Sequence, residues 1–172
     1  MKVYIACALT HVPRKLFAEY AIFLHSLAAF LTKSAHNVTY ALVHSDPILA
    51  TKPISERARF CYLWDKELVE DAEVLVAEAS FPSIGLGIEL QVAAANGTPI
   101  VLCFCDREQN KATPVSYENP DHTRHDLQIG EGFVSLMALG LPSVFRVIRY
   151  SDVIDATSRI AESLALLEKS SW

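Results

Sequence analysis

The chain has 172 residues, of which 51% are hydrophobic and 20% are charged, and its formal net charge is −5. Because domains commonly contain about 100–200 residues, we expect residues 1–172 to form a single domain. A negative balance argues against binding of a nucleic acid polymer, which needs a basic face. A small anionic ligand stays possible, since a few backbone N–H groups are enough to bind one.

The first quarter of the chain predicts a strand followed by a helix. Residues 2–8 are apolar without a polar face, which is typical of a strand in a sheet covered on both sides. Residues 13–33 carry apolar side chains at helical spacing. Their apolar stretch contains Glu19 and His25 and falls short of the ~20 residues of a membrane span, so we interpret it as a buried helix.

The next elements repeat this alternation. Residues 38–43 predict a strand, and a loop with two prolines follows it. A helix is predicted at residues 55–71, with Ser55 as its N-cap. A third strand is predicted at 74–79 and a third helix at 84–96, which ends at the favoured stop Asn96-Gly97.

The last part of the chain contains a break in the pattern. A strand is predicted at residues 98–104, but residues 106–130 are polar and contain two prolines. Such a long loop in a compact domain is usually functional or mobile, and we expect it to be an insertion. A short helix at 131–140, a strand at 144–148 and a helix at 151–169 complete the prediction.

Strands that alternate with helices predict an α/β fold, because parallel strands need crossover helices of right-handed sense. We expect a doubly wound, flavodoxin- or Rossmann-like domain with a five-stranded parallel sheet and helices on both faces. The four cysteines favour reduced thiols and a cytoplasmic location. The short N-terminal apolar run lacks a cleavage pattern of small residues, which argues against a signal peptide.

Residues 73–89 carry the strongest functional signal. A strand-like run leads into a small-residue loop with Gly85 and Gly87, and Glu89 follows at the start of a helix. Open α/β folds bind ligands at this edge of the sheet, where Glu89 would be a nucleophile or base. The alternative is an acid that complements the helix dipole, and the full dinucleotide-binding fingerprint is absent.

Other candidate residues are weaker when taken alone. Asp65 is typical of a solvated acid on a helix, and Tyr4 of a core residue with a bonded hydroxyl. Ser80 and Ser83 are either caps or phosphate ligands. His11 and Arg14 follow the first strand, where they would meet an anionic ligand. His122 and His125 match a metal-binding pair only in their spacing. We expect no metal and no cofactor.

Residues 65–90 resemble the central motif of the nucleoside 2-deoxyribosyltransferase family, in the branch of 2'-deoxynucleoside 5'-monophosphate N-glycosidases. The motif reads Asp-x6-Ala-Glu-Val-Leu-Val-Ala-Glu-Ala-Ser-x-Pro-Ser-x-Gly-x-Gly-x-Glu-Leu. Residues 2–6 and 97–104 also match. The resemblance implies that Glu89 attacks the anomeric carbon of the sugar, that Asp65 helps the base to depart, and that Tyr4 orients the nucleophile.

The resemblance also implies a phosphate site and a homodimer. Ser83 matches a phosphate-binding serine, and Ser135 matches a serine that reaches the site of the neighbouring subunit. The phosphate loop of the branch reads Gly-Ser-Ile-Arg, whereas this chain has Cys-Ala-Leu-Thr at residues 7–10. The substrate-binding candidates in this loop are Ala8, Thr10 and His11, and His11 or Arg14 would substitute for the missing serine and arginine. In addition, Leu139 stands where the branch carries an arginine.

These observations predict an enzyme that hydrolyses the base–sugar bond of (2'-deoxy)nucleoside 5'-monophosphates through a covalent glycosyl–Glu89 intermediate. A carboxylate that captures an oxocarbenium-like centre and a second acid that assists the leaving group suit this reaction. One alternative is a deoxyribosyltransferase that moves the sugar between bases. Two others are a non-catalytic nucleotide-binding domain and a flavin-binding flavodoxin-like protein. We expect a small nucleotide or nucleoside as the ligand and no membrane partner.

Overall fold

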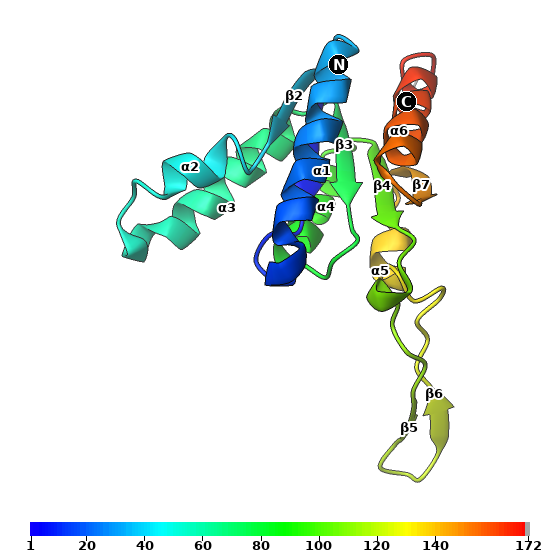
Figure 1. Ribbon diagram of the computed structural model, residues 1–172. Helices are drawn as coiled ribbons and strands as arrows, with labels where there is room; N and C mark the ends of the chain where they lie inside the picture. The colour runs from blue at the N-terminus through cyan, green and yellow to red at the C-terminus, as the bar shows by residue number, and fades with distance from the viewer. Residues whose placement is uncertain (171–172) are drawn as a thin grey trace.

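The computed structural model describes residues 1–170 and is built around a parallel sheet of five strands (Figure 1). The strand order is β2-β1-β3-β4-β7, and all four neighbouring pairs are parallel. This order confirms the predicted doubly wound α/β class. The strands are β1 (Lys2–Cys7), β2 (Asn37–Tyr40), β3 (Val74–Glu78), β4 (Ile100–Cys105) and β7 (Val144–Tyr150).

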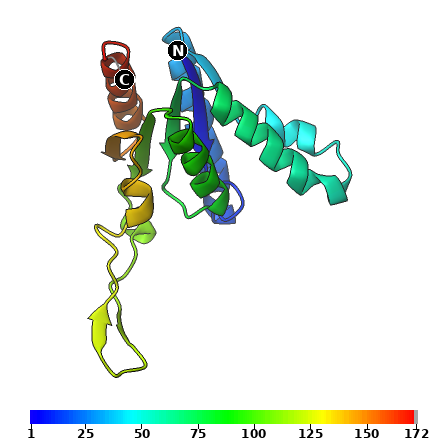
Figure 2. The same cartoon turned by 180° about the vertical axis from the view of Figure 1, so that it is seen from behind.

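Helices cover both faces of the sheet, as Figures 1 and 2 show from opposite sides. One face carries α1 (Arg14–Lys33) and α6 (Val153–Leu167). The other carries α3 (Ile54–Asp71), α4 (Ile84–Ala95) and the short α5 (Leu136–Leu139). Because successive strand residues point to opposite faces, Tyr4 and Ala6 pack toward α4, whereas Val3 and Ile5 pack toward α1.

Helix α1 is the one helix among residues 1–170 that is long and apolar enough to cross a membrane by length and composition. In this fold it lies on the sheet beside α6. Its buried side chains are Tyr20, Leu24, Leu27, Ala28 and Leu31. A core helix of this kind passes the same test of length and composition as a membrane span.

The largest departure from the predicted elements lies between β2 and α3. The second strand ends at Tyr40, and the following segment contains a five-residue helix, α2 (Ser45–Leu49), where a loop was predicted. Helix α3 begins at Ile54 after Pro53, and its N-cap makes no side-chain hydrogen bond, so the prediction of Ser55 as N-cap was wrong. Proline is compatible with a helix start because its fixed φ suits the first turn and it has no N–H to satisfy.

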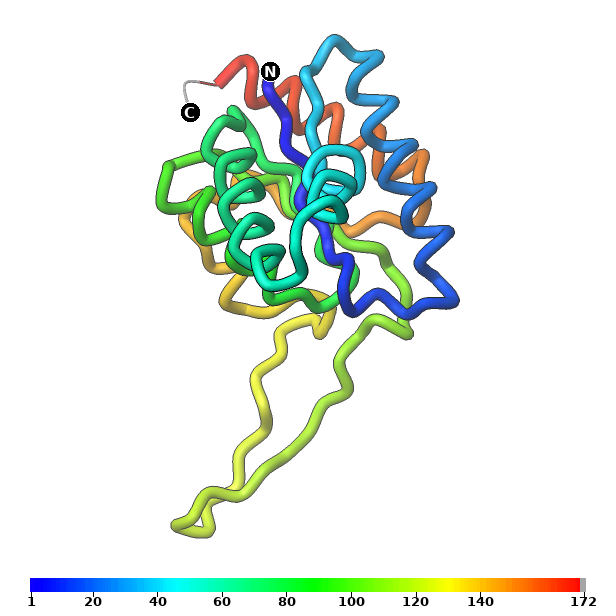
Figure 3. Tube along the Cα trace, turned by 90° about the vertical axis from the view of Figure 1, so that its left-hand side faces the viewer, coloured from blue at the N-terminus to red at the C-terminus, as the bar shows by residue number. Residues whose placement is uncertain are grey.

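The inserted segment 106–130 forms an arm that extends away from the sheet (Figure 3). It holds a single 3-10 turn, η1 (Glu108–Asn110), and an antiparallel hairpin of β5 (Ser116–Glu118) and β6 (Arg124–Asp126). Both strands of the hairpin are exposed along their whole length. The polar composition of this segment explains why it adds nothing to the core.

Candidate active site

The strand order reverses direction between β1 and β3, which places a topological switch point at their carboxyl ends. The order 2-1-3-4-5 is that of flavodoxin-like sheets, which bind ligands at this point. Tyr4 lies on β1 opposite Leu75 of β3, and its side chain faces α4. Helix α4 follows β3 directly and contacts both strands, so its first turns lie beside the switch point.

Glu89 and Tyr4 meet at this place. The Tyr4 hydroxyl donates a hydrogen bond of 2.6 Å to Glu89 Oε1, although the two residues are 85 positions apart in the chain. Ser83 begins the helix as its N-cap, and its hydroxyl accepts a 3.2 Å hydrogen bond from the Leu86 N–H. The strand, the capped turn and the helix therefore hold the Glu89 carboxylate over β1.

Asp65 comes from α3 and belongs to the same cluster. Its Oδ1 accepts a 2.6 Å hydrogen bond from the Ser45 hydroxyl, and its Oδ2 accepts a 3.4 Å contact from the Cys61 thiol. The Asp65 charge raises the pKa of both Glu89 and Tyr4, which shows that the three groups interact electrostatically. Of the three residues to which the family resemblance gave catalytic roles, Tyr4 and Glu89 are joined by a hydrogen bond, and Asp65 lies within electrostatic range of both.

The environment of Glu89 favours its neutral form. Burial raises its pKa to about 8, the negative charge of Asp65 adds to the rise, and the hydrogen bond from Tyr4 opposes it. A carboxyl group with such a pKa is typical of functional sites. Burial also raises the pKa of Cys61, to about 11, so this thiol stays protonated at neutral pH.

We expect Tyr4→Phe to shift the titration of Glu89 upward. The hydroxyl stabilises the charged carboxylate, so its removal raises the pKa further above 8. The phenylalanine ring keeps the packing, so the fold should be unchanged. The measurement is kcat/KM against pH for the base release that the family resemblance implies, in which the titration should move to higher pH. An unchanged profile would contradict the role of Tyr4 in holding the carboxylate.

The two glycines lie inside helix α4, which agrees with the predicted helix at 84–96 and corrects the prediction of a glycine loop before Glu89. The helix begins at Ile84, so Gly85 and Gly87 occupy its first turn and a half. A Cβ built on Gly87 meets nothing within 4 Å, and one on Gly85 meets only Ser83 Oγ at 3.7 Å. The backbone does not require glycine at either position, and the space next to Gly87 is open.

The loop after β1 lies at the carboxyl edge of the sheet, as predicted for Ala8, Thr10 and His11. Ala8 is buried, whereas Thr10 and His11 are exposed. The Arg14 guanidinium turns back to this loop and donates a 3.1 Å hydrogen bond to the Thr10 carbonyl oxygen. Arg14 therefore places a cation at the loop even though residues 7–10 contain none.

Ser135 occupies the N-cap position of α5, and its side chain makes no capping hydrogen bond. It is exposed, and no hydrogen bond among residues 1–170 joins it to Tyr4 or Glu89. Helix α5 lies on the same face of the sheet as α4, because Ala138 and Leu139 pack against the hydrophobic core between the sheet and α4. Leu139 is therefore a packing residue here.

Sequence reasoning missed the two residues that hold Asp65. Ser45 was assigned to a loop, and Cys61 was noted only as a thiol. Helical spacing offered a signal for Cys61, since it lies one turn before Asp65 on the same face. No local signal pointed to Ser45. Within residues 1–170 no group of three or more metal-ligating side chains lies together.

The fold and this cluster define the class of protein: a flavodoxin-like α/β domain with two carboxyl groups and a tyrosine at the switch point of the sheet. No family model matches the chain. It is 31% identical over 101 residues to "Putative 2'-deoxynucleoside 5'-phosphate N-hydrolase 1" of Thermofilum pendens, covering 58% of this chain and 55% of that protein. A protein of the same name from Syntrophotalea carbinolica is 34% identical over 62 residues, covering 36% and 44%. The chain thus matches about half the length of these relatives.

Solved structures share the fold over nearly the whole chain. The CMP N-glycosidase BcmB of Clostridium botulinum superposes with a TM-score of 0.57 and 16% identity, covering 94% of this chain and 98% of that one. The 2-deoxyribosyltransferase of Bacillus psychrosaccharolyticus does so with a TM-score of 0.55 and 14% identity, covering 91% and 90%. The sequence relatives and the shared fold together confirm the predicted resemblance to the nucleoside 2-deoxyribosyltransferase family.

Proposed function

We propose that this protein is an N-glycosidase that hydrolyses the bond between base and sugar in (2'-deoxy)nucleoside 5'-monophosphates. The observation that carries the proposal is the hydrogen bond between Tyr4 and Glu89 at the switch point of the sheet, with Asp65 within electrostatic range of both groups. The names of the sequence relatives, which are 5'-phosphate N-hydrolases, support the same substrate class.

The proposed reaction has two steps. The Glu89 carboxylate attacks C1' of the sugar, the C1'–N bond breaks, and its electron pair leaves with the base, which takes up a proton from solvent through Asp65. Water then attacks C1' of the glycosyl ester and gives up a proton to solvent, which releases the sugar phosphate and restores the carboxylate. Such covalent capture of an oxocarbenium-like centre is the general strategy of retaining glycosidases.

A direct test is to incubate the protein with deoxynucleoside and ribonucleoside 5'-monophosphates and to measure free base by chromatography. Base release that disappears in Glu89→Gln supports the proposal. If no substrate yields base, the proposal is wrong, and nucleotide binding measured by calorimetry then distinguishes a non-catalytic binding domain. A colourless preparation argues against a flavin-binding protein.

A deoxyribosyltransferase is the second candidate, and the changed loop at residues 7–10 favours it. The first half-reaction is common to both enzymes, and only the acceptor differs. Adding a free acceptor base to a deoxynucleoside donor should yield a new nucleoside if the second candidate is correct. The sole formation of free base and sugar would reject it.

The position of Arg14 supports a nucleotide as the substrate. Its guanidinium lies on the loop that would face a 5'-phosphate, bonded to the Thr10 carbonyl oxygen. We expect Arg14→Ala to raise KM for a nucleoside 5'-monophosphate about tenfold, the order expected for a lost charged hydrogen bond. The KM for the matching nucleoside should not change. Lys15→Ala, on the exposed neighbouring residue, is the control; equal effects of both variants would contradict a phosphate contact.

A homodimer is part of the proposal. Exposed apolar side chains lie on the face of the sheet that carries the site, namely Ile84, Ile88, Leu136 and Met137. Exposed apolar patches on a soluble protein often mark an interface, and a second copy at this face would bring its Ser135 near the cluster. Sedimentation showing only monomer at working concentration would contradict this.

The four free cysteines support the proposed cytoplasmic location.

A further inference from the structure

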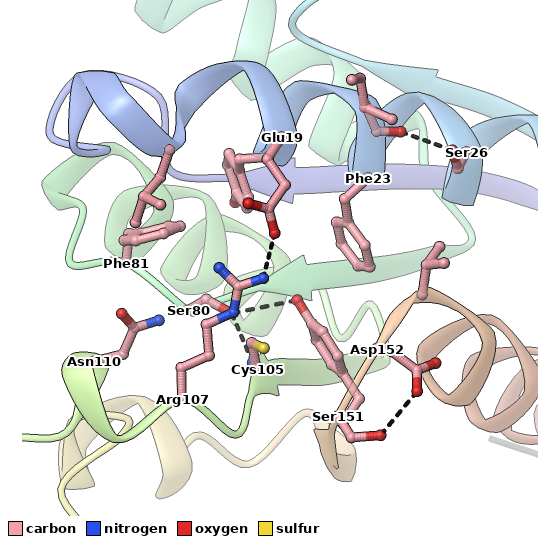
Figure 4. Close-up of a pocket in the computed structure, with 15 residues that line it drawn as sticks. Glu19, Phe23, Ser26, Ser80, Phe81, Cys105, Arg107, Asn110, Ser151 and Asp152 are labelled. Atoms are coloured by element: carbon pink, nitrogen blue, oxygen red, sulfur yellow. Dashed lines mark hydrogen bonds and ion pairs between the residues drawn. The ribbon is translucent and has the colours of Figure 1, made fainter.

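A cavity of about 270 Å³ lies on the opposite face of the sheet from the Tyr4–Glu89 cluster. It opens between α1 and α6 at the carboxyl ends of β3, β4 and β7. Neither Tyr4, Asp65 nor Glu89 lines it. Figure 4 shows the side chains around it, which converge from α1, from the loop after β3 and from the start of α6.

Behind this cavity lies Glu78, a fully buried carboxyl group that accepts several hydrogen bonds. Tyr150 donates one of 2.8 Å, and Tyr20 and Ser80 donate two more through their hydroxyls. The Ser80 hydroxyl also accepts a 2.7 Å bond from the Cys105 N–H. Because these hydroxyls are turned inward to Glu78, the two tyrosines present their rings toward the cavity.

The lining includes four aromatic rings, those of Tyr20, Phe23, Phe81 and Tyr150. Phe23 stacks on Tyr150 with ring centroids 5.2 Å apart and an interplanar angle of 9°, and Phe81 meets Tyr20 edge-on at 5.1 Å. Flat rings fixed by their neighbours favour a flat ligand, since aromatic pairs prefer stacked and edge-to-face arrangements. The volume is just below the range of about 300–1,000 Å³ usual for ligand sites, which suits a single or fused ring.

Two polar features restrict the ligand further. Arg107 is the only cation among the lining residues, and it forms an ion pair with Glu19. The lining therefore has no unpaired positive charge that would bind a phosphate group. The Asn110 Nδ2 atom is buried and has no hydrogen-bond partner. Figure 4 shows this amide directed inward, toward Arg107 and Ser80. Leaving a buried donor unpaired lowers stability by about 1–3 kcal/mol. The terminal torsion of the asparagine side chain is soft, so the amide can turn toward a ligand.

We propose that this cavity binds an uncharged planar heteroaromatic molecule of the nucleobase class. The ring lies against Phe23 and Phe81, and an acceptor atom of the ring takes a hydrogen bond from Asn110 Nδ2. The site is separate from the proposed catalytic cluster and does not depend on catalysis. Its test is therefore a measurement of binding and not of turnover.

The first experiment compares benzimidazole with indole by calorimetry on the full chain at neutral pH. The two bicyclic rings have the same shape, but only benzimidazole carries a ring nitrogen that accepts a hydrogen bond. We expect benzimidazole to bind about tenfold more tightly, the order of one net hydrogen bond. In Asn110→Leu this preference should vanish, while Gln109→Leu, on the exposed neighbour, should keep it. Equal affinities of the wild type for both rings would overturn the proposal.

The second experiment locates the bound ring. Ile22 lines the cavity and is 65% exposed, so Ile22→Trp should fill the mouth of the cavity with little strain. The control is Ile154→Trp, at a position on α6 that is 76% exposed and does not line the cavity. We expect adenine and benzimidazole to lose at least tenfold in affinity only in Ile22→Trp, with circular dichroism unchanged. Binding retained in Ile22→Trp would place these rings elsewhere, and absence of binding to the wild type at millimolar concentration would also overturn the proposal.

Discussion

Glu89→Gln should reduce base release by about three orders of magnitude or more, the range typical of losing a catalytic nucleophile. The neutral amide cannot form the glycosyl ester, so the first step loses its covalent route. The change preserves size, and the amide oxygen can still accept the hydrogen bond from Tyr4. Initial rates of base release from a deoxynucleoside 5'-monophosphate are the measurement. Rates within tenfold of wild type would contradict the nucleophile assignment.

The same variant should be more stable than the wild type at alkaline pH. The pKa of Glu89 rises from 4.5 to about 8 on folding, so the folded state binds the extra proton and wild-type stability falls as pH rises from about 4.5 through about 8. Glu89→Gln removes this cost, which is roughly 4–5 kcal/mol at pH 8.5 for a pKa shift of this size. At pH 5 the two proteins should be nearly equal. Urea unfolding at both values tests this, with Glu67→Gln at an exposed position of α3 as control.

The pH dependence of kcat/KM should have a rising limb that ends near pH 8. A nucleophile must be deprotonated, and the pKa of Glu89 in the free protein is about 8. Because kcat/KM reports the free enzyme, the rate should rise about tenfold per pH unit below that value and then level off. The measurement is kcat/KM for one nucleotide from pH 5.5 to 9.

The opposite slope would reassign the residue. If kcat/KM falls as pH rises through about 8, Glu89 acts as the protonated acid, a role that a raised pKa also suits. Asp65→Asn gives an internal control, because removing its negative charge should lower the pKa of Glu89 and move the titration to lower pH. Since the two carboxyl groups interact, the observed values belong to the pair.

Hydrophobic periodicity alone determined the α/β class and the order of the main elements. The buried strands Val74–Glu78 and Ile100–Cys105 read as apolar runs because both of their faces are covered. The sequence prediction was wrong at residues 41–53, where a segment with two prolines forms α2 instead of a loop. The N-cap of the next helix was also wrong, because capping depends on contacts with neighbouring elements. The sequence prediction also did not foresee that residues 106–130 form a hairpin, since their exposed strands carry no apolar pattern.

The tertiary structure decided which side chains meet. Family resemblance singled out Tyr4, Asp65 and Glu89, but only the strand order brings the Tyr4 hydroxyl to 2.6 Å from Glu89 Oε1. Ser45 and Glu78 carried no signal, because a hydroxyl or carboxyl gains its partners from elements distant in the chain. Local sequence encodes which surface of an element is buried, whereas contacts and pKa values depend on how those surfaces pack. The motif at residues 65–90 is therefore readable from the sequence, whereas the raised pKa of Glu89 and the second cavity are properties of the fold.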